Sequence, residues 1–476
     1  MKHQESFFEW EDSFKVLENV EADIYTNGIL KISNVKFEKI DIFRNDSKLL
    51  NLCFYTQQGI YYDLIKNEDK NCNLEVELKL KESKIYAFNS IVIHELDTLC
   101  ETFSYTKGTV ETKCTAYKII FLSDRERTIL KEWYGCNNKL NFYHGLKTSK
   151  VTEETIKYKI QNSVAYEIKN KAESFNKNSF WVKLKDYKFK VSIIKSSNDK
   201  KDFNRYVIEY REKWGMIPNK EERYDISTFL SFVIGTKLIK FGESYFNNEY
   251  LTQKEYISPC PIDISFLYQA NLPFFSEDYR YNDTDMVIKQ LPKMMQKYFQ
   301  LKEKYRLNEV FSTLFIKSYL NFNFINYVTY IEMLANIDVK QKKTLISSAR
   351  FRKVLKDLNK VKNVPKCIKD KFQILNTIGI GKNVQRLLSQ HKIEYSRYKD
   401  VFHIRGKVVH GANVDVGEMY IASEKAKELL TILTLKKLNY TGYIRNFVNS
   451  NELILMKDMS KVNIESLHLK NNNNFL

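Results

Sequence analysis

The sequence predicts an α+β protein, with a strand-rich N-terminal half followed by a C-terminal all-α helical bundle. Hydrophobic residues recur with a period of two up to about residue 148, and with a helical period after residue 286. A stretch rich in proline, acidic and aromatic residues, 258–285, separates these two patterns. We expect four parts: a strand-rich domain (1–148), a mixed α/β sensing or regulatory region (149–285), a helical domain (286–460) and a frayed tail (461–476).

The first part is typical of an antiparallel sheet with one face in solvent. Residues 73–81 alternate aliphatic with charged side chains, and residues 27–43 follow a turn dipeptide with a broken alternation. Two further stretches, 84–93 and 114–122, extend the predicted sheet.

The middle region gives mixed signals. Residues 180–194 predict a strand pair that turns around Lys185 and Asp186. Asp225 is the residue type that caps a helix N-terminus, and Gly235 is the type that ends one, so a helix is expected between them.

The C-terminal part is expected to be a bundle of helices. A helix ending at Gly411 and a last amphipathic helix over 424–444 follow from the hydrophobic spacing. An earlier helix places one apolar stripe toward the core, formed by Phe324, Tyr327, Val328, Ile331, Leu334 and Ala335.

Charge is concentrated in this C-terminal part. Residues 295–476 contain 32 Lys/Arg against 15 Asp/Glu, nearly the whole excess of a chain with net charge +18. Such a surface suits a partner rich in phosphate or an anionic membrane. No signal peptide or membrane-spanning run is recognisable, and the seven cysteines form no CxxC pair. We therefore expect a cytoplasmic protein with no metal, no cofactor and no membrane attachment.

The stretch 402–411, FHIRGKVVHG, places Arg405 and His410 five positions apart near the end of a predicted helix. On an ideal helix this spacing separates two side chains by about 140° and about 7.5 Å along the axis, so they do not share one face. The alternative interpretation is a surface arginine and a helix-terminal histidine without a catalytic role.

A basic helical bundle with R-x4-H-G, preceded by a helix containing a central Glu332, resembles the HEPN superfamily of prokaryotic ribonucleases, specifically its Apea-like branch. The resemblance covers roughly residues 300–445. It implies a HEPN helical bundle with metal-independent endoribonuclease activity on tRNA or other single-stranded RNA in antiphage defence by abortive infection. It also implies a homodimer with a composite active site. HEPN nucleases usually have a polar residue after the arginine, where this chain has Gly406.

The resemblance assigns catalytic roles to Arg405, His410 and Glu332. Histidine can move protons near neutral pH and the arginine fork suits phosphate, while Glu332 orients one of them or pairs with a nearby lysine. Tyr395 and Tyr398 are either base-stacking residues or core aromatics, and His403 is expected to be structural. The predicted RNA-binding residues are Lys407, Lys342, Lys343, Arg350, Arg352 and Lys353.

Two other functions remain open. The bundle can be a non-catalytic module that binds RNA or a partner, or the chain can be a toxin held inactive by a separate antitoxin. In the defence hypothesis, the N-terminal half binds a phage-derived trigger or restrains the nuclease.

Overall fold

The computed structural model describes residues 26–30, 35–44, 49–57, 59, 74–78, 90–104, 108–122, 127–137, 154–160, 163–170, 179–194, 203–247, 251–260, 283–315, 319–339, 348–360, 380–449, 452–457, 459 and 461–463. The chain divides into two compact units, Met1–Pro292 and Lys293–Leu476, which we call the N-terminal unit and the C-terminal unit. Strands dominate the first and helices the second, so the predicted α+β class is confirmed.

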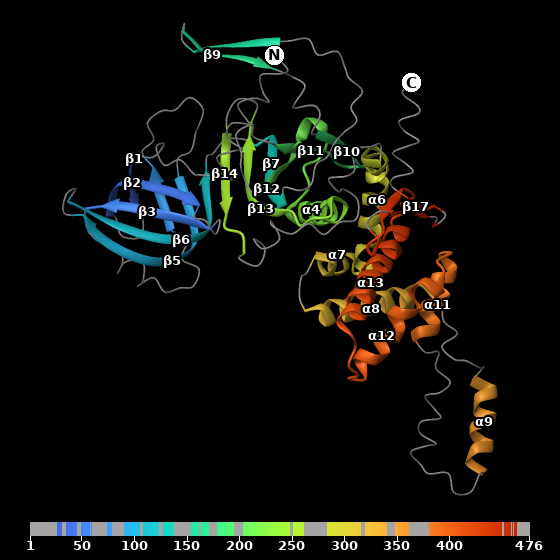
Figure 1. Ribbon diagram of the computed structural model, residues 1–476. Coiled ribbons are helices and arrows are strands. Elements are labelled where there is room, and N and C mark those ends of the chain that lie inside the picture. The colour runs from blue at the N-terminus through green and yellow to red at the C-terminus, as the bar shows by residue number, and fades with distance from the viewer. Residues whose placement is uncertain are drawn as a thin grey trace. The chain divides into compact units, whose positions relative to one another are not determined.

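The N-terminal unit is built on a twelve-stranded antiparallel sheet (Figure 1). Its strands, in spatial order, are β10 (Ser179–Lys183), β11 (Lys188–Ile194), β12 (Phe203–Arg211), β7 (Ile129–Asn137), β13 (Ile239–Phe246), β14 (Leu251–Ile257), β6 (Thr109–Leu122), β3 (Leu50–Thr56), β2 (Val35–Arg44), β1 (Thr26–Leu30), β4 (Leu74–Leu78) and β5 (Ser90–Ser104). A separate hairpin consists of β8 (Glu154–Ile160) and β9 (Ser163–Asn170).

One end of this sheet closes on itself. The long strand β5 pairs with β6 as well as with β4, so β6, β3, β2, β1, β4 and β5 form a ring of six strands. Figure 1 shows these strands curling around one another at the blue and cyan end of the sheet. The ring closes where β4 pairs with residues Ser90–Ile93 of β5, and this pairing satisfies backbone groups that an edge strand would otherwise leave unpaired.

Each stretch predicted to form strands contains described strand residues, and residues 84–89 of the predicted stretch 84–93 lie outside the described part. Residues 180–194 form the hairpin β10–β11, and the stretches 27–43 and 73–81 contain β1, β2 and β4. The predicted domain boundary at residue 148 follows β7, yet β7 is hydrogen-bonded to β12 and β13 from beyond that point. The sheet is therefore continuous across residue 148.

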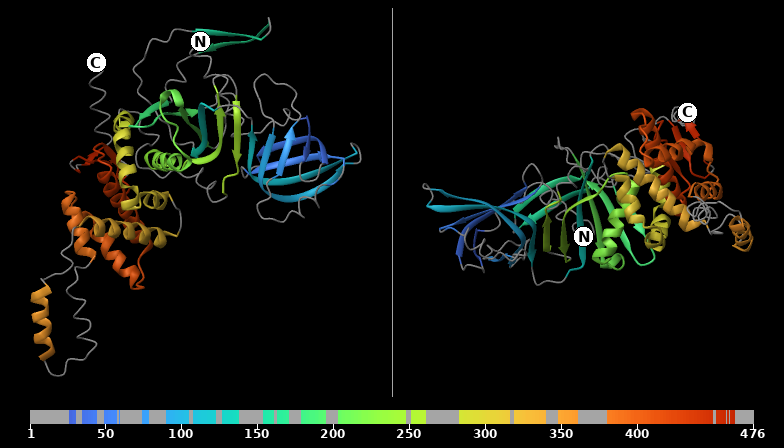
Figure 2. Two further views of the ribbon diagram at one scale, coloured as in Figure 1. Left: turned by 180° about the vertical axis from the view of Figure 1, so that it is seen from behind. Right: turned by 90° about the horizontal axis from the view of Figure 1, so that it is seen from below.

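Helix α4 (Lys220–Ile234) lies against the sheet (Figure 2). Its capping residue is Asn219 rather than the predicted Asp225, because Asn219, six residues earlier, forms a reciprocal capping box with Glu222. The predicted end at Gly235 is confirmed, and this glycine adopts the left-handed conformation with φ of 79°.

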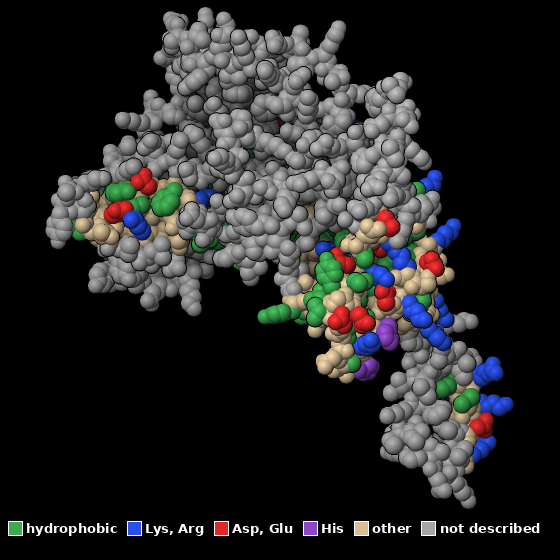
Figure 3. All heavy atoms as spheres, in the orientation of Figure 1, with side chains coloured by type: hydrophobic (Ala, Val, Ile, Leu, Met, Phe, Trp, Pro, Cys, Tyr) green, Lys and Arg blue, Asp and Glu red, His purple; other side chains and the backbone are tan. Residues whose placement is uncertain are grey.

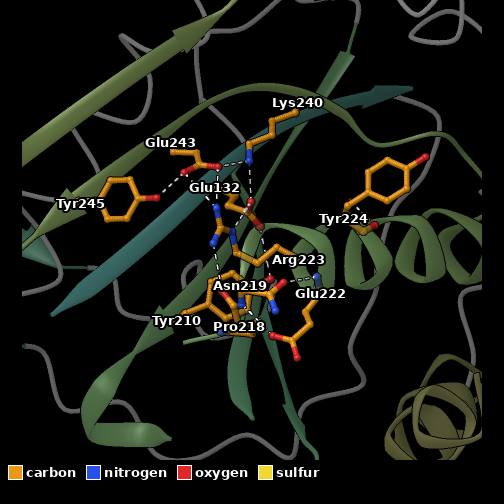
Figure 4. Close-up of polar contacts among 11 residues, drawn as sticks. Glu132, Tyr210, Pro218, Asn219, Glu222, Arg223, Tyr224, Lys240, Glu243 and Tyr245 are labelled. Carbon is orange, nitrogen blue, oxygen red and sulfur yellow. Dashed lines mark hydrogen bonds and ion pairs between the residues drawn. The ribbon is translucent and has the colours of Figure 1, made fainter. Parts of the chain in front are cut away.

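A buried ion cluster links α4 to two strands of the sheet (Figure 4). Glu132 on β7 and Glu243 on β13 lie directly opposite each other, an arrangement that is unfavourable without cations. Arg223 from α4 donates to both carboxylates, through Nε to Glu132 at 3.0 Å and through Nη2 to Glu243 at 3.1 Å. Lys240 pairs with both glutamates as well, and Tyr245 donates to Glu243 at 2.7 Å.

The C-terminal unit is organised around helix α8 (Leu320–Asp338), which contacts α7, α11, α12 and α13. Its predicted core stripe is confirmed, since all six residues of that stripe are buried. The described helices of this unit are α7 (Leu307–Phe315), α8, α9 (Ser348–Lys360), α11 (Ile380–Gln390), η4 (Tyr395–Tyr398), α12 (Lys399–Val409) and α13 (Val416–Lys437), together with the second half of α6 (Asp283–Tyr305).

The end of the C-terminal unit differs from the predicted all-α bundle. The last helix, α13, begins at Val416 behind an Asp415 cap and ends at Lys437, so it does not extend to residue 444. A small antiparallel sheet follows, formed by β15 (Tyr443–Arg445), β16 (Glu452–Leu455) and β17 (Lys461–Asn463). The first three residues of the predicted frayed tail thus form β17, because they pair with β16; residues 464–476 lie outside the described part.

Candidate active site

Helices α8 and α12 bring Glu332 and Arg405 together. The Nε of Arg405 lies 3.2 Å from Oε1 of Glu332, and Nη2 lies 3.4 Å from Oε2, so the two side chains meet at two points. The buried residues Val401 and Ile404 fix the orientation of α12 against the bundle. Both charged side chains come from helices that the core holds in place.

The environment of this pair is only partly closed. The Arg405 side chain is 34% exposed and the Glu332 side chain 14% exposed. Burial raises the pKa of the Glu332 carboxyl above its ordinary value, while Arg405 opposes that shift. The guanidinium is thus anchored on one side by a carboxylate and reaches solvent on the other.

His410 caps the C-terminus of α12. The chain leaves the helix through Gly411, whose φ is 72°, and two bonds close a Schellman motif: Gly411 N to Val408 O at 3.1 Å and Ala412 N to Lys407 O at 2.9 Å. The His410 side chain is exposed. Within the part of the chain that the structure describes, no hydrogen bond joins it to Arg405, as the spacing of five residues predicts.

His403, predicted to be structural, lies in line with two other polar residues of α12. It is exposed, and it precedes Lys407 by four residues and His410 by seven, so the three side chains follow one face of α12. Lys407 lies 3.8 Å from Glu418 and keeps 37% of its side chain exposed. Figure 3 shows histidine and basic side chains gathered on this surface. The pattern i, i+4, i+7 was the signal that could have identified His403.

Helix α9 carries three of the predicted RNA-binding residues. Arg350, Arg352 and Lys353 are all exposed. Two residues that the sequence reasoning did not select, Lys356 and Lys360, are also exposed and continue from Arg352 at intervals of four, which places them along one side of the helix. The predicted residues Lys342 and Lys343 lie outside the described residues.

The two tyrosines before the motif, Tyr395 and Tyr398, make different contacts. Tyr398 is fully buried and its hydroxyl donates to the buried Glu428 at 2.7 Å, so it is a core aromatic and not a base-stacking residue. The ring of Tyr395 stacks on Phe402, with centroids 5.9 Å apart. Both residues therefore support the position of η4 and α12.

Comparisons with family models, with curated proteins and with solved structures find no match to this chain. Among the helices that the structure describes, none has the length and apolar character needed to cross a membrane.

Proposed function

We propose that the C-terminal unit is a metal-independent endoribonuclease of the HEPN class, which cleaves tRNA or other single-stranded cellular RNA in antiphage defence. The observation that carries this proposal is the pairing of Arg405 with Glu332, beside an exposed His410 at the end of the same helix. These are the three residues to which the HEPN resemblance assigns catalytic roles.

The chemistry follows from the residue types. A base removes the proton of the ribose 2′-hydroxyl, the 2′-oxygen attacks the phosphorus, and the 5′-oxygen leaves with a proton from an acid. His410 serves as the acid or base, and Arg405 binds the negatively charged phosphate in the transition state. The products are a 2′,3′-cyclic phosphate and a 5′-hydroxyl.

By resemblance to HEPN nucleases, the second proton-transfer group comes from a second copy of the chain. In that arrangement a homodimer places one Arg405/His410 pair from each protomer across a two-fold axis. The exposed His403 offers a different source, because it shares a face of α12 with His410 and Lys407 in a single protomer.

RNA binding would extend beyond the reacting phosphate. Residues 339–371 contain twelve Lys/Arg and two Asp/Glu, and the exposed basic side chains of α9 lie within this segment. Contacts to several phosphates make RNA affinity fall steeply as salt rises. In the cytoplasm, the N-terminal unit would bind a phage-derived trigger or restrain the nuclease.

The test is RNA cleavage by the purified full chain in excess EDTA, with and without lysate from phage-infected cells as activator. We expect His410→Ala to lower kcat by about 10² to 10⁴ and Arg405→Ala by about 10² to 10³. Arg386→Ala, a change of an exposed arginine on α11, is the matched control and should cleave like the parent. Equal cleavage by all four proteins would refute the assignment.

His403→Ala distinguishes the two sources of the second proton-transfer group. A loss comparable to that of His410→Ala indicates that one protomer supplies both histidines. If His403→Ala retains activity, mixing the inactive Arg405→Ala and His410→Ala chains tests the composite site. The heterodimer contains one Arg405 and one His410, contributed by opposite protomers, and only a composite site can use both.

A second candidate is a non-catalytic module that binds RNA, and Gly406 favours it because a polar residue usually follows the arginine in HEPN nucleases. RNA binding that weakens with salt, without cleavage under any activating condition, would establish this alternative.

A further inference from the structure

Strand β10 forms one end of the twelve-stranded sheet, with no described strand along its outer side. Eleven strands of the sheet are hydrogen-bonded to neighbours on both sides, because the far end closes into the six-stranded ring. Among the described strands, β10 is paired only with β11. An open edge presents backbone N–H and C=O groups to which another extended chain can pair.

The edge strand is held firmly by its inner face. Phe180 and Val182 are buried, and β10 keeps an unbroken register with β11 from Ser179 to Lys183. The turn of this hairpin is anchored as well, since the Tyr187 hydroxyl donates to Glu222 of α4. A partner chain would therefore meet a strand that is already ordered, which lowers the entropic cost of pairing.

The outer face of this edge combines aromatic and basic side chains. Trp181 is 44% exposed, contacts the ring of Trp214 edge-on at 4.5 Å, and has the Lys188 ammonium 4.7 Å from its ring centroid. Because side chains alternate along a strand, the exposed Lys183 shares this face with Trp181, and Lys188 lies directly opposite Lys183 on β11.

Lysines commonly protect an edge from unwanted pairing, but a half-exposed tryptophan at the centre of the strand has the opposite effect. We propose that the open edge of β10 is a docking site for an extended, acidic segment of a partner protein. The excess of lysine in the hairpin predicts that the partner segment is negatively charged. The hairpin contains Lys183, Lys185, Lys188 and Lys190 against Asp186.

The bound segment would add a thirteenth strand to the sheet. Its backbone would hydrogen-bond to β10, while alternate side chains would face the outer surface. A carboxylate there lies near Lys183, and an apolar side chain near Trp181, which are the cross-strand pairs that stabilise a sheet. The surface belongs to the N-terminal unit and is independent of the proposed nuclease chemistry.

The test uses fluorescence anisotropy with the full chain and a fluorescein-labelled nine-residue peptide of alternating glutamate and valine. A matched lysine–valine peptide tests charge, and a glutamate–valine peptide N-methylated at alternate residues tests strand pairing. We expect only the unmodified acidic peptide to bind, and its affinity to fall as salt rises.

Variants then locate the site. Trp181→Ala should weaken binding by about tenfold and Lys183→Glu by about fivefold. The matched controls are Tyr224→Ala, which removes an exposed aromatic residue of α4, and Lys220→Glu, which reverses an exposed lysine of that helix. Both should bind like the parent.

Three results would overturn the proposal. They are absence of binding by the acidic peptide, equal binding by the N-methylated peptide, and unchanged affinity in Trp181→Ala and Lys183→Glu. A labelled oligouridine that binds in place of the peptide and is lost in Trp181→Ala would identify RNA as the ligand instead.

Discussion

Both units contain a glutamate that faces an arginine, and the surroundings of the two pairs differ. In the N-terminal unit, the side chains of Glu243 and Arg223 are 5% and 10% exposed, and Glu243 has Lys240 and Tyr245 as additional partners. In the C-terminal unit, Glu332 and Arg405 are 14% and 34% exposed. Among the described residues, Glu332 has only Arg405 as an ionic partner.

This difference is the basis on which we propose a structural role for the first pair and a chemical role for the second. In a buried network in which each charge is compensated, no donor is left for a ligand. Removing one member leaves the remaining charges buried without a partner and without solvation by water. Mutation of a partly exposed ion pair lowers the stability of the protein only slightly. The guanidinium of such a pair can direct some of its N–H donors toward a phosphate. The comparison predicts opposite responses of stability and activity in the two units.

The largest expected effect is on stability in the N-terminal unit. Arg223→Met leaves Glu132 and Glu243 facing each other with Lys240 as the remaining cation, and should lower the free energy of unfolding by about 3 to 5 kcal/mol. The matched change Arg405→Met should cost under about 1 kcal/mol of stability and lower kcat for RNA cleavage by about 10² to 10³. Urea unfolding and a cleavage assay on both proteins measure the two effects.

The comparison breaks down if Arg405→Met destabilises the protein as much as Arg223→Met. Adding Glu132→Gln and Glu243→Gln to Arg223→Met should restore part of the lost stability, because the uncompensated buried charges are then removed.

Protonation of Glu243 and protonation of Glu332 should change the stability of the protein in opposite directions as pH falls. The cluster holds the pKa of Glu243 at about 2, below its ordinary 4.5, because Lys240 and Arg223 outweigh the burial of the carboxyl. At pH values above its unfolded pKa, the ionised Glu243 therefore contributes about 3 kcal/mol to the free energy of unfolding. This contribution is lost as pH falls from 4.5 toward 2. The raised pKa of Glu332 makes protonation favour the folded state.

Urea midpoints between pH 7 and pH 3 test this prediction. The parent should lose more stability on acidification than Glu243→Gln, and Glu332→Gln should lose at least as much as the parent. Parallel pH profiles for the parent and Glu243→Gln would exclude the cluster as the acid-sensitive element.

A smaller effect is expected on substrate binding from Glu332→Gln. The amide keeps the shape of the side chain but loses the charge that orients Arg405, so we expect KM for RNA to rise about tenfold with little change in the unfolding midpoint. A carboxylate with a merely structural role would change the midpoint and leave KM unaffected. Glu332→Asp, which keeps the charge, should recover part of the binding.

Sequence patterns predicted the individual helices and strands better than the pairing between distant strands. Hydrophobic period gave the α8 stripe and the β10–β11 hairpin, since burial selects apolar residues locally. The closure of β5 onto β6 and the opposition of Glu132 and Glu243 depend on long-range pairing, which no local pattern encodes. At the candidate site, the HEPN resemblance selected Glu332 and Arg405, whereas the exposure of His403 depends on how α12 packs against the bundle.

The smallest expected effect concerns Gly406, in the interior of α12. A Cβ at this position would meet no atom within 4 Å, so Gly406→Ala should stabilise the protein by about 0.5 to 1 kcal/mol through helix propensity alone. Gly411→Ala, five residues later, should destabilise it, because φ there is 72°. Thermal unfolding of the two variants measures both signs. If Gly406→Ala also leaves RNA cleavage unchanged, the small residue after Arg405 is neutral for catalysis; a loss of cleavage would mean that the substrate approaches α12 at this glycine.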